Sequence, residues 1–398
     1  MPKIEFMAIT PIKKHVASAN QVESKKGGIY SLVVDGNNLL KIALVHKREN
    51  RNGNDYGAVI MFLKMLGDIL KKKDFDYCIV CWDGEGSGVL RWKIYKDYKA
   101  NRDKHYELYD PDMSDYDRKI LDYQRIVLEH AKEKRAKGSE TEDECFERQK
   151  RLIQAILEEL CVRQYEHALV EGDDLISYYI HHRKENEKVV IVSSDKDLTQ
   201  LINDNVIVYN PRIKDFITSK NSVEKMGVRY DNVVIEKMIC GDDSDNIKGV
   251  KGVGESTLRS LFPELTEQKV DLGFITSKAV FIQEERQKGK GKNKKKPLQS
   301  LDNILNAVTD GIQGSELYSI NRKIIDLSEP MLTEECKKYL DEVSYAVMDT
   351  SDRDMKNVYQ IVKDNDMYDI IDETKFGNLF APYMRVIMQE RRRYGKGS

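Results

Sequence analysis

Short apolar runs alternate with longer segments of helical periodicity from residue 29 onward. Four runs are rich in Val and Ile and have the length of buried strands, at residues 30–34, 77–82, 189–192 and 206–209. Between them, the apolar spacing over 56–70 and 174–182 predicts helices. This alternation predicts an α/β fold, with a central, mostly parallel sheet wrapped by helices.

Four regions follow from the same pattern. Residues 1–28 are polar and irregular and are expected to form an N-terminal extension, and 29–230 form the α/β domain. A polar insertion at 103–167 predicts two helices, and Thr141 and Glu144 have capping-box spacing before the second, which is expected to end near Leu160. Residues 231–310 predict helix, tight turn, helix, with a mobile lysine-rich loop at 284–297. Residues 311–398 are expected to be helical.

Composition narrows the class of protein. The 398 residues are 33% charged with a formal net charge of −2, so attraction to nucleic acid must come from local patches. No apolar stretch is long enough to span a membrane, and the N-terminus lacks a signal-peptide core. Six cysteines favour a reducing cytosol over a disulfide scaffold. Cys78 and Cys81 lie in an apolar run without a second pair, which favours core packing over zinc or redox chemistry.

Acidic residues gather where the predicted strands end and helices begin. They are Asp35 in VDGNN, Asp83 in WDG, Glu171, Asp173 and Asp174 in EGDD, Asp195 and Asp197 in SSDKD, and Asp242 and Asp245 in GDDSDN. Parallel strands bring their carboxyl ends to one edge, so these side chains should converge. Such a cluster repels itself unless cations hold it, and hard ions such as Mg²⁺ prefer oxygen ligands. Turn formation by Asp-Gly and helix capping by EGDD are the structural alternatives.

Two further segments carry candidate chemistry. In LRWKIYKDYKANR, Lys99 and Arg102 are three apart and are expected to face the acids from one helix, although a solvated lysine is the common alternative. The turn NIKGVKGVG contains Gly249, Gly252 and Gly254, which allow backbone amides to face a phosphate. An ordinary glycine-rich loop is the alternative there.

Taken in order, the five motifs resemble the flap endonuclease family of 5′ nucleases, especially the bacteriophage 5′→3′ exonucleases. The resemblance covers about residues 30–262 and is interrupted over 103–167. It implies a PIN-like 5′ nuclease fold with a helical arch at 103–167 and a helix-hairpin-helix module.

The resemblance also implies a site. Two Mg²⁺ or Mn²⁺ ions would be held by the acids, one mainly by Asp35, Asp83, Glu171 and Asp173, the other by Asp174, Asp195, Asp197, Asp242 and Asp245. Charge on the phosphate would be stabilised by Lys99, Arg102 and Arg91. The terminal base would stack on Tyr95 or Tyr98. DNA would contact the hairpin at Gly249, Lys251, Gly252 and Gly254, where K⁺ binds in the family.

The implied function is a 5′-3′ exonuclease or flap endonuclease. It would hydrolyse phosphodiester bonds near 5′ ends of nicked, branched or flapped DNA, or of RNA–DNA hybrids, and remove primers during replication. We expect a monomer in the cytoplasm of a bacterial or phage-infected cell, with a single-strand binding protein as an expected partner. A noncatalytic structure-specific DNA-binding protein would be expected to lose the metal ligands, yet every expected acid is present. A PIN-like ribonuclease would have fewer acids and no hairpin.

Overall fold

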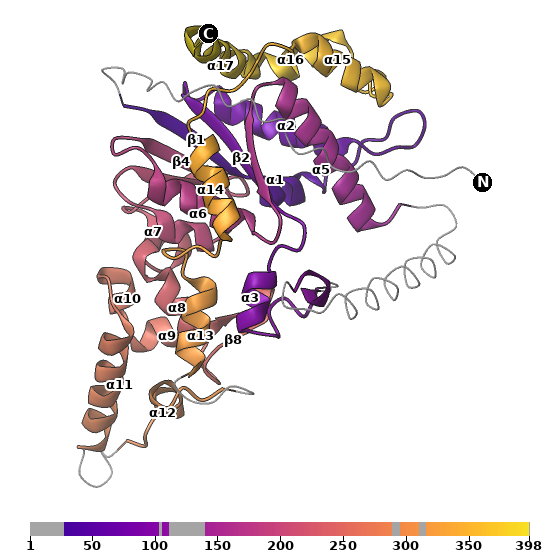
Figure 1. Ribbon diagram of the computed structural model, residues 1–398. Coiled ribbons are helices and arrows are strands. Elements are labelled where there is room, and N and C mark those ends of the chain that lie inside the picture. Colours follow the sequence, from indigo (N-terminus) through magenta and orange to yellow (C-terminus); the bar gives the residue numbers. More distant parts are fainter. Residues whose placement is uncertain (1–27, 103–105, 111–139, 289–294, 310–315, 398) are drawn as a thin grey trace.

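The fold is built on a six-stranded sheet in a computed structural model (Figure 1). The structure describes residues 28–102, 106–110, 140–288, 295–309 and 316–397. The expected helix at the start of the 103–167 insertion, most of the N-terminal extension and the centre of the lysine-rich loop lie outside these residues.

The strand order is β3-β2-β1-β4-β5-β6, and only β6 is antiparallel to its neighbour. The strands are β1 (Tyr30–Asp35), β2 (Tyr77–Asp83), β3 (Arg163–His167), β4 (Lys188–Val192), β5 (Val206–Asn210) and β6 (Asp215–Ile217). The four predicted strands are confirmed within two residues. β1 lies between β2 and β4, with Val33 in register with Ile79 and Ile191. The chain therefore changes winding direction beside β1, where open sheets place their sites.

Helices cover both faces because alternate strand residues point to opposite sides. Leu32 and Val34 face one hydrophobic cluster, and Val33 faces the other. The first cluster is covered by α1 (Gly36–Ala43), α2 (Gly57–Leu70), α5 (Glu142–Glu159), α15 (Met355–Asp364), α16 (Glu373–Phe380), η6 (Ala381–Tyr383) and α17 (Met384–Gly397). The second is covered by α6 (Gly172–His182), η2 (Asp197–Leu201) and α14 (Glu334–Val343).

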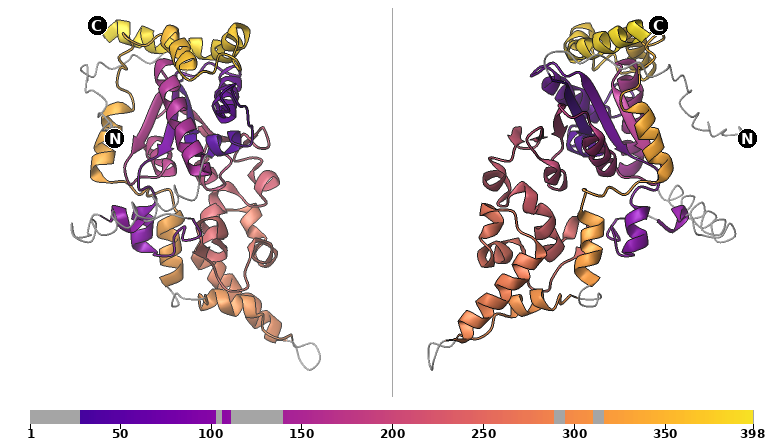
Figure 2. Two further views of the ribbon diagram at one scale, coloured as in Figure 1. Left: turned by 90° about the vertical axis from the view of Figure 1, so that its right-hand side faces the viewer. Right: turned by 60° about the vertical axis from the view of Figure 1, so that its left-hand side comes forward.

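A second, helical unit lies below the carboxyl edge of the sheet (Figures 1 and 2). It contains α7 (Ser222–Met226), η3 (Tyr230–Asn232), α8 (Val233–Cys240), β7 (Gly241–Asp242), η4 (Asp243–Asp245), β8 (Ile247–Lys248), α9 (Glu255–Leu261), α10 (Glu264–Glu267), α11 (Leu272–Gln287), α12 (Gln299–Leu305) and α13 (Glu316–Ile325). The expected helix-turn-helix is present as α8, the β7–β8 hairpin and α9. Two short elements, α3 (Val89–Ile94) and η1 (Tyr106–Tyr109), lie beside this unit.

Two boundaries differ from expectation. The capping box of Thr141 and Glu144 is formed and starts α5, but this helix buries Leu152 and Ile156 against the sheet. It is therefore part of the main domain rather than of an arch. The region 311–398 does not pack as one unit either, because α13 joins the helical unit while α14 and α15–α17 cover opposite faces of the sheet.

Candidate active site

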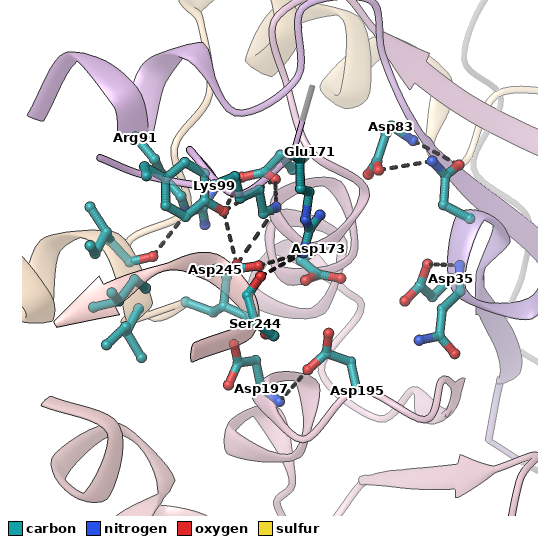
Figure 3. Close-up of a pocket in the computed structure, with 18 of the residues that line it drawn as sticks. Asp35, Asp83, Arg91, Lys99, Glu171, Asp173, Asp195, Asp197, Ser244 and Asp245 are labelled. Atoms are coloured by element: carbon teal, nitrogen blue, oxygen red, sulfur yellow. Dashed lines mark hydrogen bonds and ion pairs between the residues drawn. The ribbon is translucent and has the colours of Figure 1, made fainter. Parts of the chain in front are cut away.

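A polar pocket opens at the carboxyl ends of β1, β2 and β4 (Figure 3). Seven of the nine predicted acids line it, namely Asp35, Asp83, Glu171, Asp173, Asp195, Asp197 and Asp245. Its basic lining residues are Lys41, Arg91, Lys99 and Arg102. The remaining two predicted acids, Asp174 and Asp242, lie outside the lining.

Asp35 and Asp83 are fixed by the turns that follow their strands. Asp35 ends β1 and caps α1, its Oδ1 accepting from the backbone N–H of Asn38 at 2.9 Å. Asp83 ends β2, and its two oxygens accept from the Asn37 amide and the Gly172 backbone N–H, both at 2.8 Å. These hydrogen bonds hold both carboxylates at the carboxyl edge of the sheet.

Four carboxylates in the pocket have no basic partner. Within the described residues, no lysine or arginine forms an ion pair with Asp35, Asp83, Asp173 or Asp195. Burial, followed by the charges of Asp83 and Asp195, raises the pKa of Asp35 to about 7. Burial and the same cluster raise the pKa of Asp173 well above its usual range. The structure thus gathers negative charge that no lysine or arginine among the described residues neutralises through an ion pair.

The donor set is suited to a hard divalent cation, since every donor is a carboxylate oxygen. In the part of the chain that the structure describes, no three His, Cys, Asp or Glu side chains stand close enough together to hold one ion. The unpaired acids Asp35, Asp83, Asp173 and Asp195 nevertheless surround one side of the pocket (Figure 3). The residues therefore fit a metal by charge and chemistry.

The opposite side of the pocket is already neutralised. Glu171 pairs with Lys99, with Arg91 Nη1 at 2.7 Å and with the Tyr98 hydroxyl at 3.0 Å. Burial alone would lower the pKa of Lys99, but Glu171, Tyr98 and Asp245 outweigh it, so the pKa lies well above its usual value. Lys99 is consequently a fixed positive charge at the pocket edge.

Lys99 and Arg102 reach the acids without the helix that we expected. α3 ends at Ile94, and Lys99 has a left-handed backbone with φ of 52°, unusual for a residue with a side chain. Its backbone N–H donates to the Asp245 carbonyl at 2.8 Å. Arg102 Nη2 donates to Asp245 Oδ1 at 2.7 Å. The tight turn, held by Asp245, replaces the expected helix flank.

Arg91 and Asp174 differ from the roles that we expected. Arg91 is buried and donates to Asp174 Oδ2 at 2.5 Å and Oδ1 at 2.9 Å, and Nε donates to the Ile324 carbonyl at 2.9 Å. Asp174 Oδ1 also accepts from the Met331 backbone N–H. Both groups are occupied inside the protein, so Asp174 is not positioned as a metal ligand and Arg91 supports Glu171 from behind.

Asp242 faces a lysine that the sequence analysis did not single out. Lys237 on α8 pairs with Asp197 and donates to Asp242 Oδ2 at 2.6 Å. Asp242 Oδ1 accepts from the Ser244 backbone N–H, so the carboxylate starts η4 rather than sharing a helical face with Asp245. The only sequence signal was one lysine in an amphipathic helix, which is common.

Tyr95 and Tyr98 do not offer a stacking surface. They are 8% and 2% exposed and belong to a small apolar cluster with Ile247, Ile324 and Ile325, and Tyr98 contributes to the pocket lining only this small exposed fraction. Their apolar surroundings explain this burial, and the Tyr98 hydroxyl is used by Glu171.

The glycines of the hairpin divide into two kinds. A Cβ on Gly249 would lie 2.1 Å from the backbone of Cys240, so this glycine permits close packing of the turn on α8. Gly252, with φ of 72°, and Gly254 have open space around them, and a Cβ there would meet nothing within 4 Å. The backbone N–H of Lys251 donates to Val308, so it is not available to a phosphate. Of the four hairpin residues that we expected to contact DNA, only Gly252 and Gly254 thus have open space for a phosphate beside the backbone.

The segment that joins α13 to α14 completes the pocket. Residues 324–331, here called the C-terminal strap, contribute Ile324, Ile325 and Leu327 to its lining. The side-chain amide of Gln200 in η2 makes two hydrogen bonds to the strap: it donates to the Ile325 carbonyl at 3.1 Å and accepts from the Leu327 N–H at 2.8 Å. No motif in the sequence indicates these main-chain contacts.

Comparison with known proteins places this architecture. T5 5′-exonuclease, solved with divalent metal ions (zinc) bound, superposes with a TM-score of 0.50 at 18% identity, covering 84% of this chain and 97% of that chain. The sheet and the helices around it thus have the 5′ nuclease fold.

Sequence comparison then identifies the family. Residues 30–227 match the 5′-3′ exonuclease, N-terminal resolvase-like domain model, and the chain belongs through this domain to the 5′-3′ exonuclease family. A 5′-3′ exonuclease of Mycoplasmopsis pulmonis is 27% identical over 231 residues, 58% of this chain and 65% of that protein. One from Aquifex aeolicus is 29% identical over 201 residues, 50% of this chain and 56% of that protein. The match thus spans about three fifths of these relatives' own length. Every helix in the described residues is too short or too polar to cross a bilayer.

Proposed function

We propose that this protein is a metal-dependent 5′ nuclease that hydrolyses phosphodiester bonds near the 5′ ends of flapped, nicked or branched duplexes. One observation carries the proposal. Acids from the ends of three adjacent strands meet in one pocket without an ion pair to any described lysine or arginine, and Lys99 and Arg102 stand at its edge. Family membership supports the same reaction class.

Divalent cations would be held by Asp35, Asp83, Asp173 and Asp195, which form no ion pair with a described lysine or arginine. Glu171, Asp197 and Asp245 would contribute after exchanging lysine or arginine partners, or through water. Bound Mg²⁺ or Mn²⁺, two ions as the family resemblance implies, would supply an activated water and neutralise the scissile phosphate. Asp35 and Asp83 are held by backbone and amide donors, which presets their orientation.

Lys99 and Arg102 would stabilise charge that grows on the phosphate during cleavage. Both are already paired with acids, so an entering phosphate would compete for Lys99 with Glu171 and Asp245. A cation on Glu171 would favour that exchange, because it would take over the charge that Lys99 now neutralises. Cleavage is then coupled to metal loading through one lysine.

The hairpin between α8 and α9 would hold the duplex away from the cut. Gly252 and Gly254 leave room for a phosphodiester backbone, and contacts through main-chain groups would be independent of sequence. A monovalent cation such as K⁺ belongs to the same proposal. RNA–DNA hybrids, primer removal, monomeric action and cooperation with a single-strand binding protein are extensions of it.

A 5′-labelled flap incubated with and without Mg²⁺ tests the reaction. Wild-type protein should release short 5′ products only with metal, and Asp195→Ala should lose cleavage while retaining most duplex binding. Asp204→Ala is the matched control, because Asp204 is an exposed acid in the turn after η2. Wild-type turnover by Asp195→Ala, or cleavage in excess chelator, would exclude the proposal. An RNA–DNA hybrid of the same sequence tests the substrate range, and binding without any cleavage would favour a noncatalytic DNA-binding protein.

A further inference from the structure

An ion-pair network joins the acidic pocket to the helix that follows the hairpin. Lys196 lies between the pocket residues Asp195 and Asp197, yet its ammonium group turns away to the helical unit. Its Nζ is 2.6 Å from Glu236 of α8 and 2.9 Å from Glu255, the first residue of α9. One lysine therefore connects three elements.

Arg259 closes the network from α9. Its Nε and Nη2 donate to both oxygens of Glu236, at 2.6 and 3.0 Å, and Nη2 also donates to Glu255 at 2.7 Å. Glu236 has no exposed side-chain surface, whereas Lys196 is 24% exposed. The charges of Lys196 and Arg259 thus balance those of Glu236 and Glu255. Because Glu236 is buried, removing one of its partners would leave part of its charge uncompensated.

The location of Gly227 supports a specific fit for Arg259. Gly227 has φ of 76°, and a Cβ there would lie 2.4 Å from Arg259 Nη1. The guanidinium is thereby packed against backbone as well as paired with acids. Such an arrangement resists sliding of α9 relative to α8 and to the loop that carries Lys196.

We propose that Lys196 is a positioning residue that couples duplex binding at the hairpin to the placement of Asp195 and Asp197. The inference rests on the proposed function. When a duplex binds at the start of α9, it restricts the movement of Glu255. Because Lys196 is paired with Glu255, the backbone of Lys196 and of its sequence neighbours Asp195 and Asp197 is restricted as well. The enzyme would then cut fastest when a duplex long enough to reach the hairpin is present.

Loss of charge alone would act in the opposite direction. Removing a positive group between two acids makes the pocket more negative and would draw a divalent cation more strongly. A slower reaction in Lys196→Met would therefore report positioning rather than weaker metal binding. The variant should fold, because Arg259 still neutralises the buried Glu236.

The experiment compares two flaps with the same junction, one with a duplex that reaches α9 and one that ends before it. Single-turnover rates of wild-type protein should favour the long duplex by about tenfold, within the usual range of coupling between sites. In Lys196→Met the ratio should fall to near one, and Lys196→Arg should restore most of it. Lys225→Met is the matched control, since Lys225 is also 24% exposed and pairs with two acids away from the pocket.

Hydrogen exchange provides a readout that needs no cleavage. Binding of the long duplex in Ca²⁺ should slow exchange of amides 195–201 in wild-type protein and in Lys225→Met, but not in Lys196→Met or Glu255→Gln. Equal protection in all four proteins, or an unchanged rate ratio in Lys196→Met, would overturn the coupling. Differential protection in Ca²⁺, combined with no cleavage by any of the four proteins in Mg²⁺, would instead refute the nuclease proposal and leave the coupling supported.

Discussion

Asp35→Asn should make the metal-free protein more stable at neutral pH, although it removes a residue of the candidate active site. The substitution keeps the size of the side chain. Its Oδ1 can still accept from the Asn38 N–H, and the new amide can donate to the Ser193 hydroxyl, which now donates to Asp35 at 2.9 Å. The principal change is the loss of a buried negative charge.

The magnitude follows from the pKa of Asp35. Burial, followed by the charges of Asp83 and Asp195, raises it from 3.8 to about 7. At pH values between these two, the unfolded chain has released the proton that the folded protein retains, so stability falls as pH rises through this window. A difference of about 3 units at 1.36 kcal/mol each corresponds to about 4 kcal/mol at pH 7.5. Below pH 4 the penalty should be under about 1 kcal/mol.

Thermal unfolding in a chelator over pH 4 to 8 measures this effect. Asp35→Asn should melt roughly 5 °C above wild-type protein at pH 7.5, and the two curves should converge toward pH 4. Saturating Mg²⁺ should raise the melting temperature of wild-type protein more than that of the variant, because binding to the folded state adds stability. Asp204→Asn, which neutralises an exposed acid, should follow wild-type protein.

The reasoning would be refuted if Asp35→Asn were less stable than wild-type protein at pH 7.5 without metal. It would also fail if the difference in melting temperature between the two proteins were the same at every pH, because a change in packing alone does not depend on the protonation of Asp35.

Two further perturbations test the surroundings of the pocket. Lys237→Met should lower the free energy of unfolding by about 2–4 kcal/mol, because it leaves the Asp197 and Asp242 carboxylates without the cation that they share. Denaturant unfolding at pH 7.5 measures this loss. Added Mg²⁺ should recover part of it. In the hairpin, Gly254→Ala should fold normally but weaken duplex binding several-fold, measured by fluorescence anisotropy, whereas Gly249→Ala should reduce the melting temperature, because its Cβ would meet backbone at 2.1 Å. Equal stability of the two glycine variants would contradict the packing described for this turn.

The sheet and the strand-end acids could be predicted because they depend on local rules. Valine-rich runs form buried strands, and parallel strands put Asp35, Asp83 and Asp195 on one edge whatever the loops do. The orientation of neighbouring acids could not be predicted in the same way. Asp173 and Asp174 are successive residues of a helix and point about 100° apart, so only one can face the pocket. Which one does so depends on Arg91, which is distant in sequence.

The remaining misses have a similar origin. Lys99 and Arg102 have helical spacing, but they lie in a turn in which the Lys99 backbone N–H donates to the Asp245 carbonyl and Arg102 donates to the Asp245 carboxylate. Tyr95 has an aromatic ring that could stack on a base. It is buried instead by Ile324 and Ile325, which are distant from it in sequence. Contacts of this kind are made by backbone or by ordinary apolar side chains, which carry no motif.

The strap has a consequence for how the protein matures during synthesis. Arg91, Asp174 and η2 all make hydrogen bonds to residues 324–331, which are synthesised well after the strands that carry the pocket acids. The α/β domain can collapse earlier, but its acids have their final supports only when this late segment docks. In a nascent chain, the pocket that we propose to be the active site would therefore be completed only after this later segment has emerged and docked.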